Sequence, residues 1–196
     1  MAENMSSEPE QQARPPPESV QPPESPGSVT VRAARVDDMP RIHTLIHELA
    51  AYEGVPDGPR LSVQDLVRDG FECPSPWFFA VVAERGGQLV GYALCNRAYS
   101  SWTCRALYIE DLYVVPDMRR AGIGMKILQH LCQMSLREDV HRIDWHVLDS
   151  NAPALAFYDR LGARDLRRTE RRAALRLDRH RIEAVAGHRH HHAPPS

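Results

Sequence analysis

Apolar and polar positions along the first third of the chain follow two different periods. Val29, Val31 and Ala33 alternate with polar residues, which predicts a first strand. Between residues 42 and 49 the apolar positions recur every three or four residues, which predicts a helix that begins at Asp37 or Asp38. The sequence at 62–65 resembles a capping box and predicts a short second helix.

The pattern of the following residues predicts strands first and then alternating helices and strands. Stretches 77–84 and 88–95, joined by a glycine turn, indicate a hairpin. The next strand, 106–115, is too apolar for both of its faces to be exposed. The elements predicted after it are a helix at 121–138, a strand at 141–149, a helix at 152–160 that Gly162 closes, and last strands at 164–168 and 173–178. This order predicts a single α/β domain, with a mixed, mostly antiparallel sheet and helices on both of its faces.

The two ends of the chain differ in composition from the part between them. Residues 1–28 are dominated by Pro, Glu, Gln and Ser, and residues 187–196 are rich in His. Segments with so little to bury do not offset the entropy of ordering, so we expect both tails to be disordered. The folded domain is therefore predicted over residues 29–186.

Charge and composition exclude some classes of function. The chain has 196 residues, 42% of them hydrophobic, and a formal net charge of −2 with both signs mixed. It has no basic stripe of the kind that neutralises nucleic-acid phosphates, so we expect no nucleic-acid partner. With no signal peptide and no long apolar run, we also expect a cytoplasmic protein without a membrane partner. The four cysteines form no CxxC pair and are expected to be buried or half-buried thiols, with no metal site.

The segment with the clearest chemical meaning is the turn between strand 106–115 and the helix that follows. Gly122 and Gly124 remove side chains where a backbone can approach a ligand closely. The unpaired N–H groups at a helix start form an anion site, and Arg119 and Arg120 add charge that suits a pyrophosphate. A tight entry into a packed helix would use the same glycines. A dinucleotide fold is excluded because the glycine pair comes late and lacks a third glycine.

Two motifs together resemble the GNAT superfamily of N-acetyltransferases. One is Arg119-x-x-Gly122-x-Gly124 after an apolar strand, and the other is the segment 151–158 followed by Leu-Gly-Ala. The resemblance implies that the second segment packs beside the pantetheine arm of acetyl-CoA, with Tyr158 near the thioester. It names acetyl-CoA as the co-substrate.

Within this superfamily the chain resembles the diamine acetyltransferases, the group that contains the spermidine/spermine and thialysine enzymes. The resemblance extends from about residue 29 to residue 178, and it is clearest in the sequence segments 45–53, 69–71 and 107–114. It implies that an acetyl-CoA site is formed by Leu112, Tyr113, Val114, Arg119, Arg120, Ala121, Gly122, Ile123, Gly124, Met125, Asn151, Ala152, Pro153, Ala154 and Tyr158. It implies that the acceptor amine is faced by Tyr52, Glu53, Glu110, Asp111, Asp144, Trp145 and His146. A homodimer is also implied.

The match to this group has departures. The loop 99–102 and the residues 147–149 look more like the thialysine branch than the spermine-preferring one. Where relatives have Gly-Trp and an apolar strand, this chain reads Arg171-Arg172-Ala173. Added positive charge there disfavours a long polycation if that segment lines the acceptor groove.

The chemistry of amine acetylation assigns roles to two residues. An ammonium group has no lone pair, so the enzyme has to bind a cation and remove its proton; Glu110, acting through a water, is the candidate general base. Tyr158 is the candidate proton donor to the leaving CoA thiolate. The predicted function is direct acetyl transfer to a small cationic amine. Alternatives are a protein lysine or N-terminal acetyltransferase, and a non-catalytic acetyl-CoA-binding protein.

Overall fold

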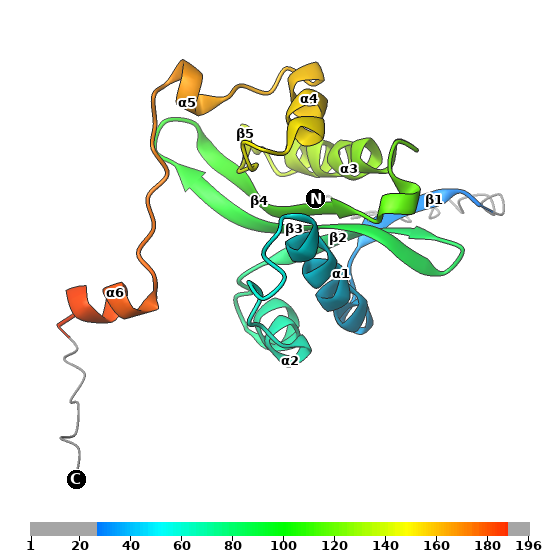
Figure 1. Ribbon diagram of the computed structural model, residues 1–196, viewed down its shortest axis with the longest axis horizontal. Coiled ribbons are helices and arrows are strands. Elements are labelled where there is room, and N and C mark those ends of the chain that lie inside the picture. The colour runs from blue at the N-terminus through cyan, green and yellow to red at the C-terminus, as the bar shows by residue number, and fades with distance from the viewer. Residues whose placement is uncertain (1–26, 188–196) are drawn as a thin grey trace, which may run out of the picture. The chain divides into compact units, whose positions relative to one another are not determined.

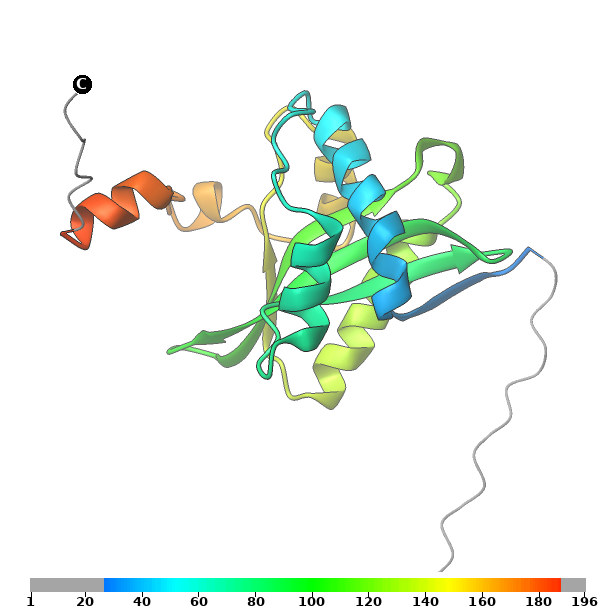
Figure 2. The same cartoon turned by 90° about the horizontal axis from the view of Figure 1, so that it is seen from below.

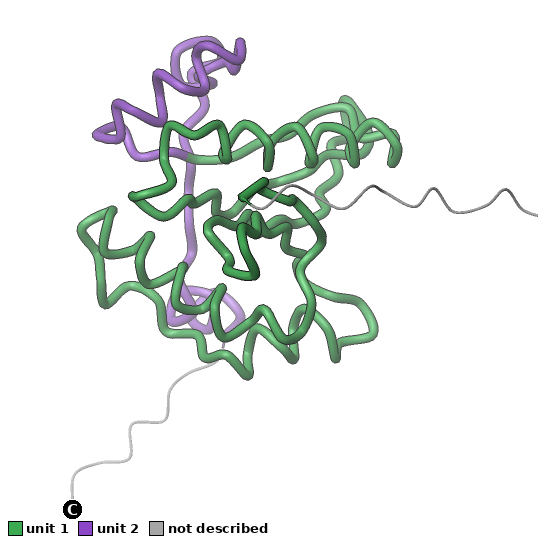
Figure 3. Tube along the Cα trace, turned by 90° about the vertical axis from the view of Figure 1, so that its right-hand side faces the viewer, with its two compact units in different colours: residues 1–146 green, residues 147–196 purple. Residues whose placement is uncertain are grey.

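The computed structural model describes residues 27–187. The chain forms two compact units, one that ends at His146 and one that begins at Val147, and Figure 3 colours them separately. Each unit is described by itself below. Apart from Gly27, Ser28 and Gly187, the two tails predicted to be disordered lie outside the described residues.

The first unit contains a mixed five-stranded sheet in which the strands follow one another in chain order. Its strands are β1 (Val29–Ala33), β2 (Phe79–Arg85), β3 (Gln88–Ser100), β4 (Cys104–Val114) and β5 (Arg142–Trp145). Strands β1 to β4 pair antiparallel, whereas β4 and β5 pair parallel, as a crossover through a helix requires. The predicted mixed, mostly antiparallel sheet is confirmed, although β5 is shorter than the predicted strand 141–149.

Helices cover both faces of this sheet. α1 (Met39–Tyr52) and α2 (Val63–Val67) lie on one face, and α3 (Ile123–Arg137) lies on the other (Figures 1 and 2). The predicted capping box opens α2: the Asp65 N–H donates to Ser62 Oγ at 3.2 Å, and the Ser62 N–H donates to Asp65 Oδ2 at 2.9 Å. A short π-helical segment, Arg68–Glu72, follows α2.

The apolar stripes predicted from sequence are the faces that the helices bury. Met39, Ile42 and Leu45 of α1 are fully buried and pack with Tyr92 of β3. On the opposite face, α3 buries Ile123, Ile127, Leu128 and Leu131. Each fully buried side chain of this size contributes about 1.5–3 kcal/mol, so these two layers hold the sheet and helices together.

The second unit is helical in its described part. It contains α4 (Ala152–Arg160), α5 (Leu166–Thr169) and α6 (Arg179–Val185). Gly162, at φ +78°, ends α4 as predicted, since its N–H bonds to Asp159 O at 2.9 Å.

The prediction of two last strands in this unit is wrong. Residues 164–168 run into α5, because the Asp165 carboxylate caps the helix by accepting the Arg167 N–H at 3.0 Å. Residues 173–178 have no regular structure. Their alternating pattern forms a strand only where another strand pairs with it, and no strand of the described residues pairs with this segment.

The four cysteines are free thiols, as predicted, but only two of them are sheltered. Cys95 is buried and Cys73 is half-buried, whereas Cys104 and Cys132 are exposed. The expectation that all four are buried or half-buried is therefore wrong for the last two. None of the helices in residues 27–187 combines the length and the apolar composition that a membrane span requires.

Candidate active site

Strand β4 has one edge that is only partly paired. On the β3 side it is paired along its whole length, but β5 accompanies it only from Ala106 to Ile109. Beyond Ile109, no strand of the described chain pairs with that edge. Backbone N–H and C=O groups that point out of this edge between Glu110 and Val114, apart from the Val114 oxygen that accepts from Arg119, are left to bind another molecule. Leu112, Tyr113 and Val114, three residues predicted to bind acetyl-CoA, lie in this segment.

A β-bulge falls where the pairing with β5 ends. Cys95 lies opposite Ile109 and Leu94 lies opposite Asp111, so Glu110 is an extra residue without a partner on β3. A bulge redirects side chains and often lies next to an active site. It explains how two consecutive carboxylates fit into an otherwise apolar strand: Glu110 is exposed and Asp111 is half-buried.

The start of α3 provides open backbone donors. Its N-cap is Gly122, in the left-handed region at φ +78°, and within the described chain no side chain caps it. The first intrahelical bond at this end runs from the Lys126 N–H to Gly122 O, so the N–H groups of Ile123, Gly124 and Met125 point out of the helix. With the positive end of the helix dipole, they form a site for phosphate oxygens.

The two arginines of the turn have different surroundings. Arg119 Nε donates to the backbone O of Val114 at 2.9 Å, and its guanidinium lies over the rings of Tyr52 (4.3 Å) and Tyr113 (5.3 Å). Arg119 thus fixes the turn against β4 and α1. Arg120 is exposed, with φ +62°, and its charge is open to solvent.

Two of the acidic residues predicted to face the acceptor act electrostatically on a third, Asp111. Burial raises the pKa of Asp111 above its ordinary value, a hydrogen bond from Tyr92 opposes this rise, and the charges of Glu110 and Glu53 add to it. Glu53 is the C-cap of α1, so helix and bulge bring the three carboxylates together. Within the described residues, the groups that shift the pKa of Asp111 include no Arg, Lys or His.

Other carboxylates of the first unit have cationic partners. Arg41 Nη1 lies 2.9 Å from Glu48 Oε1, and Arg32 lies 2.7 Å from both Asp38 and Glu84. These pairs stabilise the scaffold. The cluster of Glu53, Glu110 and Asp111, which we call the acidic trio, differs in having no such partner for its most buried member.

The residues predicted on β5 divide into two kinds. Asp144 accepts a hydrogen bond from Arg142 Nε at 2.8 Å, so its charge is already balanced. His146 follows the last residue of β5, and its Nδ1 hydrogen-bonds to the Tyr108 hydroxyl, with the ring centroids 5.7 Å apart. Because Ile109 opposes Trp145, the next position along each strand is Glu110 and His146. His146 therefore lies beside the bulge.

Sequence reasoning missed Tyr92 and Tyr108, which hold Asp111 and His146. An aromatic residue in a strand has the same pattern as an ordinary core residue. The register of β3 against β4, with its bulge, places the Tyr92 hydroxyl beside Asp111, and the register of β4 against β5 places the Tyr108 hydroxyl beside His146.

The other predicted residues belong to the second unit. Asn151 is the N-cap of α4 and accepts the Ala154 N–H at 3.3 Å. Burial raises the pKa of Tyr158, so its phenol stays protonated and able to donate over the physiological range. The ring of Tyr158 lies against Phe157, with centroids 5.2 Å apart.

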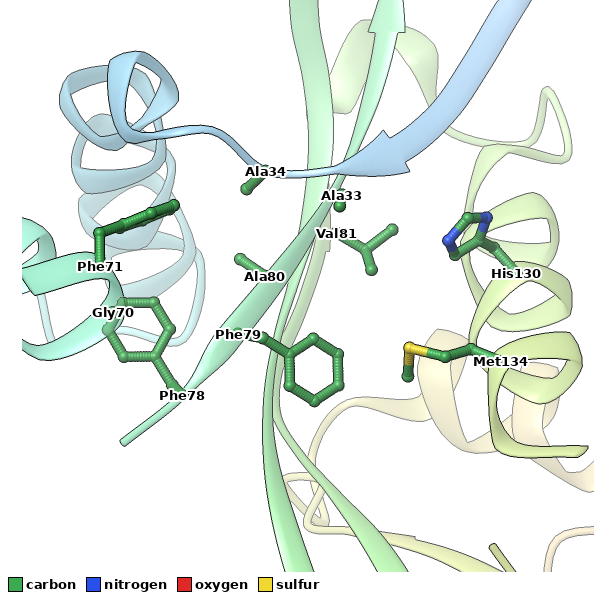
Figure 4. A pocket seen from close by; sticks show the side chains of 10 residues that line it. All are labelled: Ala33, Ala34, Gly70, Phe71, Phe78, Phe79, Ala80, Val81, His130 and Met134. Carbon is green, nitrogen blue, oxygen red and sulfur yellow. The ribbon is translucent and has the colours of Figure 1, made fainter. Parts of the chain in front are cut away.

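A separate cavity of about 130 Å³ lies near the end of β1 and has no comparable chemistry (Figure 4). Phe78 borders it on one face of the sheet, and Phe79 and Met134 border it on the other. Its one titratable lining group, within the described residues, is His130, whose pKa is lowered by burial and by the charge of Arg137. An apolar lining of this kind offers no group for acid–base work.

An open strand edge beside a glycine-capped helix start is an arrangement suited to a phosphate-bearing ligand. The model of the acetyltransferase (GNAT) family matches residues 42–163. The chain therefore belongs to the GNAT family, and it is an acetyltransferase that takes its acetyl group from acetyl-CoA.

Individual relatives agree with this assignment. The thialysine N-epsilon-acetyltransferase of Sus scrofa is 37% identical over 168 residues, which cover 82% of this chain and 98% of that protein. The Homo sapiens spermidine/spermine N(1)-acetyltransferase-like protein 1 is 34% identical over 80% of this chain and 23% of its own length. Among solved structures, an integron cassette protein from V. cholerae has a TM-score of 0.67 at 22% identity and covers 81% of this chain and 98% of its own, which shows the fold alone.

These findings confirm the predicted family, fold class, enzyme class and co-substrate. The roles of individual residues stay predictions.

Proposed function

We propose that this enzyme acetylates the primary amine of a small cationic acceptor, either thialysine or a diamine or polyamine. The observation that carries the proposal is the acidic trio beside the open edge of β4, in which no cationic group of residues 27–187 pairs with Asp111. A cationic acceptor supplies that missing charge. The relatives named for thialysine and for spermidine/spermine acetylation support the same class of acceptor.

Acetyl-CoA binding is assigned to two backbone surfaces and one helix start. The residues from Arg120 to Met125 hold the pyrophosphate through the exposed N–H groups of α3. The unpaired edge at Leu112–Val114 binds the pantetheine by backbone hydrogen bonds. The resemblance assigns Asn151 to Ala154 and Tyr158 of the second unit to acetyl-CoA as well.

The reaction begins with loss of a proton from the acceptor. With a pKa of about 10.4, only about one amine in a thousand is neutral at physiological pH. Glu110 accepts this proton through a water molecule. Its place in the bulge leaves the carboxylate exposed, whereas Asp111 and Glu53 hold the cation.

The neutral nitrogen then attacks the thioester carbon and forms a C–N bond. A backbone N–H of the Leu112–Val114 segment stabilises the oxyanion. The C–S bond breaks, the thiolate leaves with the electron pair, and Tyr158 donates a proton to it. The second proton of the nitrogen passes through solvent to the Tyr158 phenolate and restores it, and Glu110 releases the first proton to solvent. The products are the acetamide, CoA and one released proton, without an acetyl-enzyme intermediate.

We further propose that the enzyme acts as a homodimer, as the resemblance implies, and that it works in the cytoplasm. Sedimentation equilibrium of the full chain tests the first point. A single monomeric species at micromolar concentration would contradict it.

The proposed function is tested by CoA release from acetyl-CoA with a panel of acceptors. The panel contains thialysine, lysine, putrescine, spermidine, spermine and a histone-tail peptide. Turnover on thialysine or a small polyamine, and none on the peptide, is the expected result. Turnover on the peptide alone would make the protein a peptide acetyltransferase. Acetyl-CoA binding without turnover on any acceptor would make it a non-catalytic binding protein.

A further inference from the structure

The side chain of Tyr92 extends from the hydrophobic core to the acidic trio. It lies in the middle of β3, is fully buried, and packs with Met39, Ile42 and Leu45 of α1. Its hydroxyl donates a hydrogen bond to Asp111 Oδ2 at 2.8 Å. A phenol held on all sides by packed neighbours has one orientation, so its hydroxyl has a fixed position.

The position of Asp111 is electrostatically unfavourable for a carboxylate. Glu110 on its own strand and Glu53 at the end of α1 repel its charge, and burial removes water from it. The other titratable groups near it on β3 and β4 are neutral, because burial raises the pKa of Tyr92 and Tyr113 and raises that of the Cys95 thiol to about 12. Among the described residues, Tyr92 supplies the one side-chain hydrogen bond that favours the charged form of Asp111.

We propose that Tyr92 is a positioning residue for the acceptor: its buried hydroxyl holds one oxygen of Asp111 in place, which leaves the other oxygen to bind the acceptor's ammonium group. This inference rests on the proposed function and deepens it, since it names the core residue that keeps the acidic trio ready for a cation. The positive charge of the acceptor then balances the negative charge of Asp111, for which residues 27–187 supply no cationic partner.

The role has a pH signature. Because the pKa of Asp111 is raised, the KM for a cationic acceptor falls as the pH rises through that pKa and Asp111 becomes charged. Without the Tyr92 hydroxyl, the pKa of Asp111 rises further, so the fall in KM moves to higher pH. A purely structural loss of packing would raise KM without moving its pH dependence.

The test replaces Tyr92 by Phe, which removes one oxygen atom and keeps the ring. Putrescine and thialysine serve as probes. We expect the KM of the acceptor to rise about tenfold at pH 7 and to approach the wild-type value near pH 9, with the KM for acetyl-CoA unchanged. Ile42→Val is the matched control, because it removes a methyl group from the same packed layer without touching Asp111.

Two further measurements make the test independent of turnover. Carbon-13 NMR of the Asp carboxyls reports the titration of Asp111, identified by its absence in Asp111→Asn. In the Asp111→Asn background, Tyr92→Phe is expected to have no further effect on acceptor KM, since the group it positions is gone.

The outcomes separate the two proposals. If the wild type turns over amines and Tyr92→Phe shows the wild-type KM at every pH, the inference is wrong and the proposed function stands. An unchanged Asp111 titration in Tyr92→Phe also overturns the inference. If the wild type turns over no amine, the proposed function fails. The inference about Tyr92 is then tested by calorimetric titration with putrescine. It is overturned if the wild type and Tyr92→Phe bind putrescine equally well, or if neither binds it.

Discussion

Arg119 Nε donates a hydrogen bond to the backbone oxygen of Val114, so the turn that opens α3 is tied to the last residue of β4. The same guanidinium lies over the rings of Tyr52 and Tyr113. Sequence reasoning assigned this arginine to the pyrophosphate by its charge. In the structure its side chain contacts the scaffold, and the charge of Arg120 is exposed.

From this difference we predict unlike effects for the two arginines. Arg119→Gln is expected to raise the KM for acetyl-CoA about tenfold or more, because it removes a hydrogen bond from a charged donor and two cation–π contacts that fix the turn. Arg120→Gln is expected to have a smaller effect that fades between low and 0.5 M salt, since an exposed charge is screened. Acetyl-CoA titrations at two ionic strengths check both, and equal salt dependence for the two variants would contradict the assignment.

The two proposed proton-transfer residues are tested by kcat. Glu110→Gln and Tyr158→Phe are each expected to lower kcat by about 10²- to 10⁴-fold while acetyl-CoA still binds. For Glu110→Gln, the loss is expected to shrink as the pH approaches the pKa of the amine, because more acceptor arrives neutral. For Tyr158→Phe we expect no such recovery. Wild-type kcat/KM in both variants would show that the catalytic assignments are wrong.

Asp111→Asn is expected to weaken acceptor binding and at the same time stabilise the free enzyme. Burial and two like charges raise the pKa of Asp111 in the folded protein, so the folded state binds this proton more tightly than the unfolded state. The free energy of unfolding therefore falls as the pH rises from the unfolded pKa, about 3.9, through the folded one.

Thermal unfolding of the wild type and Asp111→Asn measures this effect. We expect equal Tm values near pH 3, a growing advantage for Asp111→Asn across the interval between the two pKa values, and a constant advantage of a few degrees above it. A lower Tm for Asp111→Asn at pH 7 would contradict the raised pKa. Asp111→Asn would then be more stable than the wild type but bind the acceptor more weakly, a trade-off between stability and function that is common at binding sites.

The elements that the sequence predicted well are those whose burial is decided locally. Ile123, Ile127 and Leu131 recur at helical spacing and lie on one buried face. The predicted helix, 121–138, therefore agrees with α3 to within two residues at each end. The predicted strands at 164–168 and 173–178 failed for the opposite reason. Alternation describes a strand only if another strand is there to pair with, and that is a property of the whole fold.

The candidate site could be predicted where the backbone does the binding. Glycines at the start of a helix are visible in the sequence, and Gly122 and Gly124 lie where expected. The three residues of the acidic trio were among those predicted to face the acceptor, but their arrangement depends on a bulge at Glu110 that no local pattern indicates. Tyr92 could not be separated from other core aromatics, because its role depends on the register of β3 against β4. Tyr92 lies opposite Tyr113, and the partner of its hydroxyl, Asp111, is two residues from Tyr113 on β4.

Gly91 is predicted to couple the stability of the sheet to acetyl-CoA binding. It pairs with Val114, and a Cβ added to it would lie 2.8 Å from the Tyr113 carbonyl oxygen and 3.4 Å from Ile127 Cδ1. Gly91→Ala therefore has to push the end of β4 away from β3, at a cost of about 1–3 kcal/mol. The displaced residues include the unpaired edge proposed to bind pantetheine, so affinity for acetyl-CoA is expected to fall together with Tm.

The matched control for this variant is Gly86→Ala in the β2–β3 turn. Gly86 has φ +56°, and a Cβ there meets no atom within 4 Å, so the substitution introduces backbone strain of about 1–2 kcal/mol without touching β4. We expect it to lower Tm by a similar amount and to leave acetyl-CoA affinity at the wild-type value. Calorimetric titration of both variants with acetyl-CoA distinguishes the cases: equal affinity losses would mean that lost stability, and not the position of the β4 edge, accounts for the effect of Gly91→Ala.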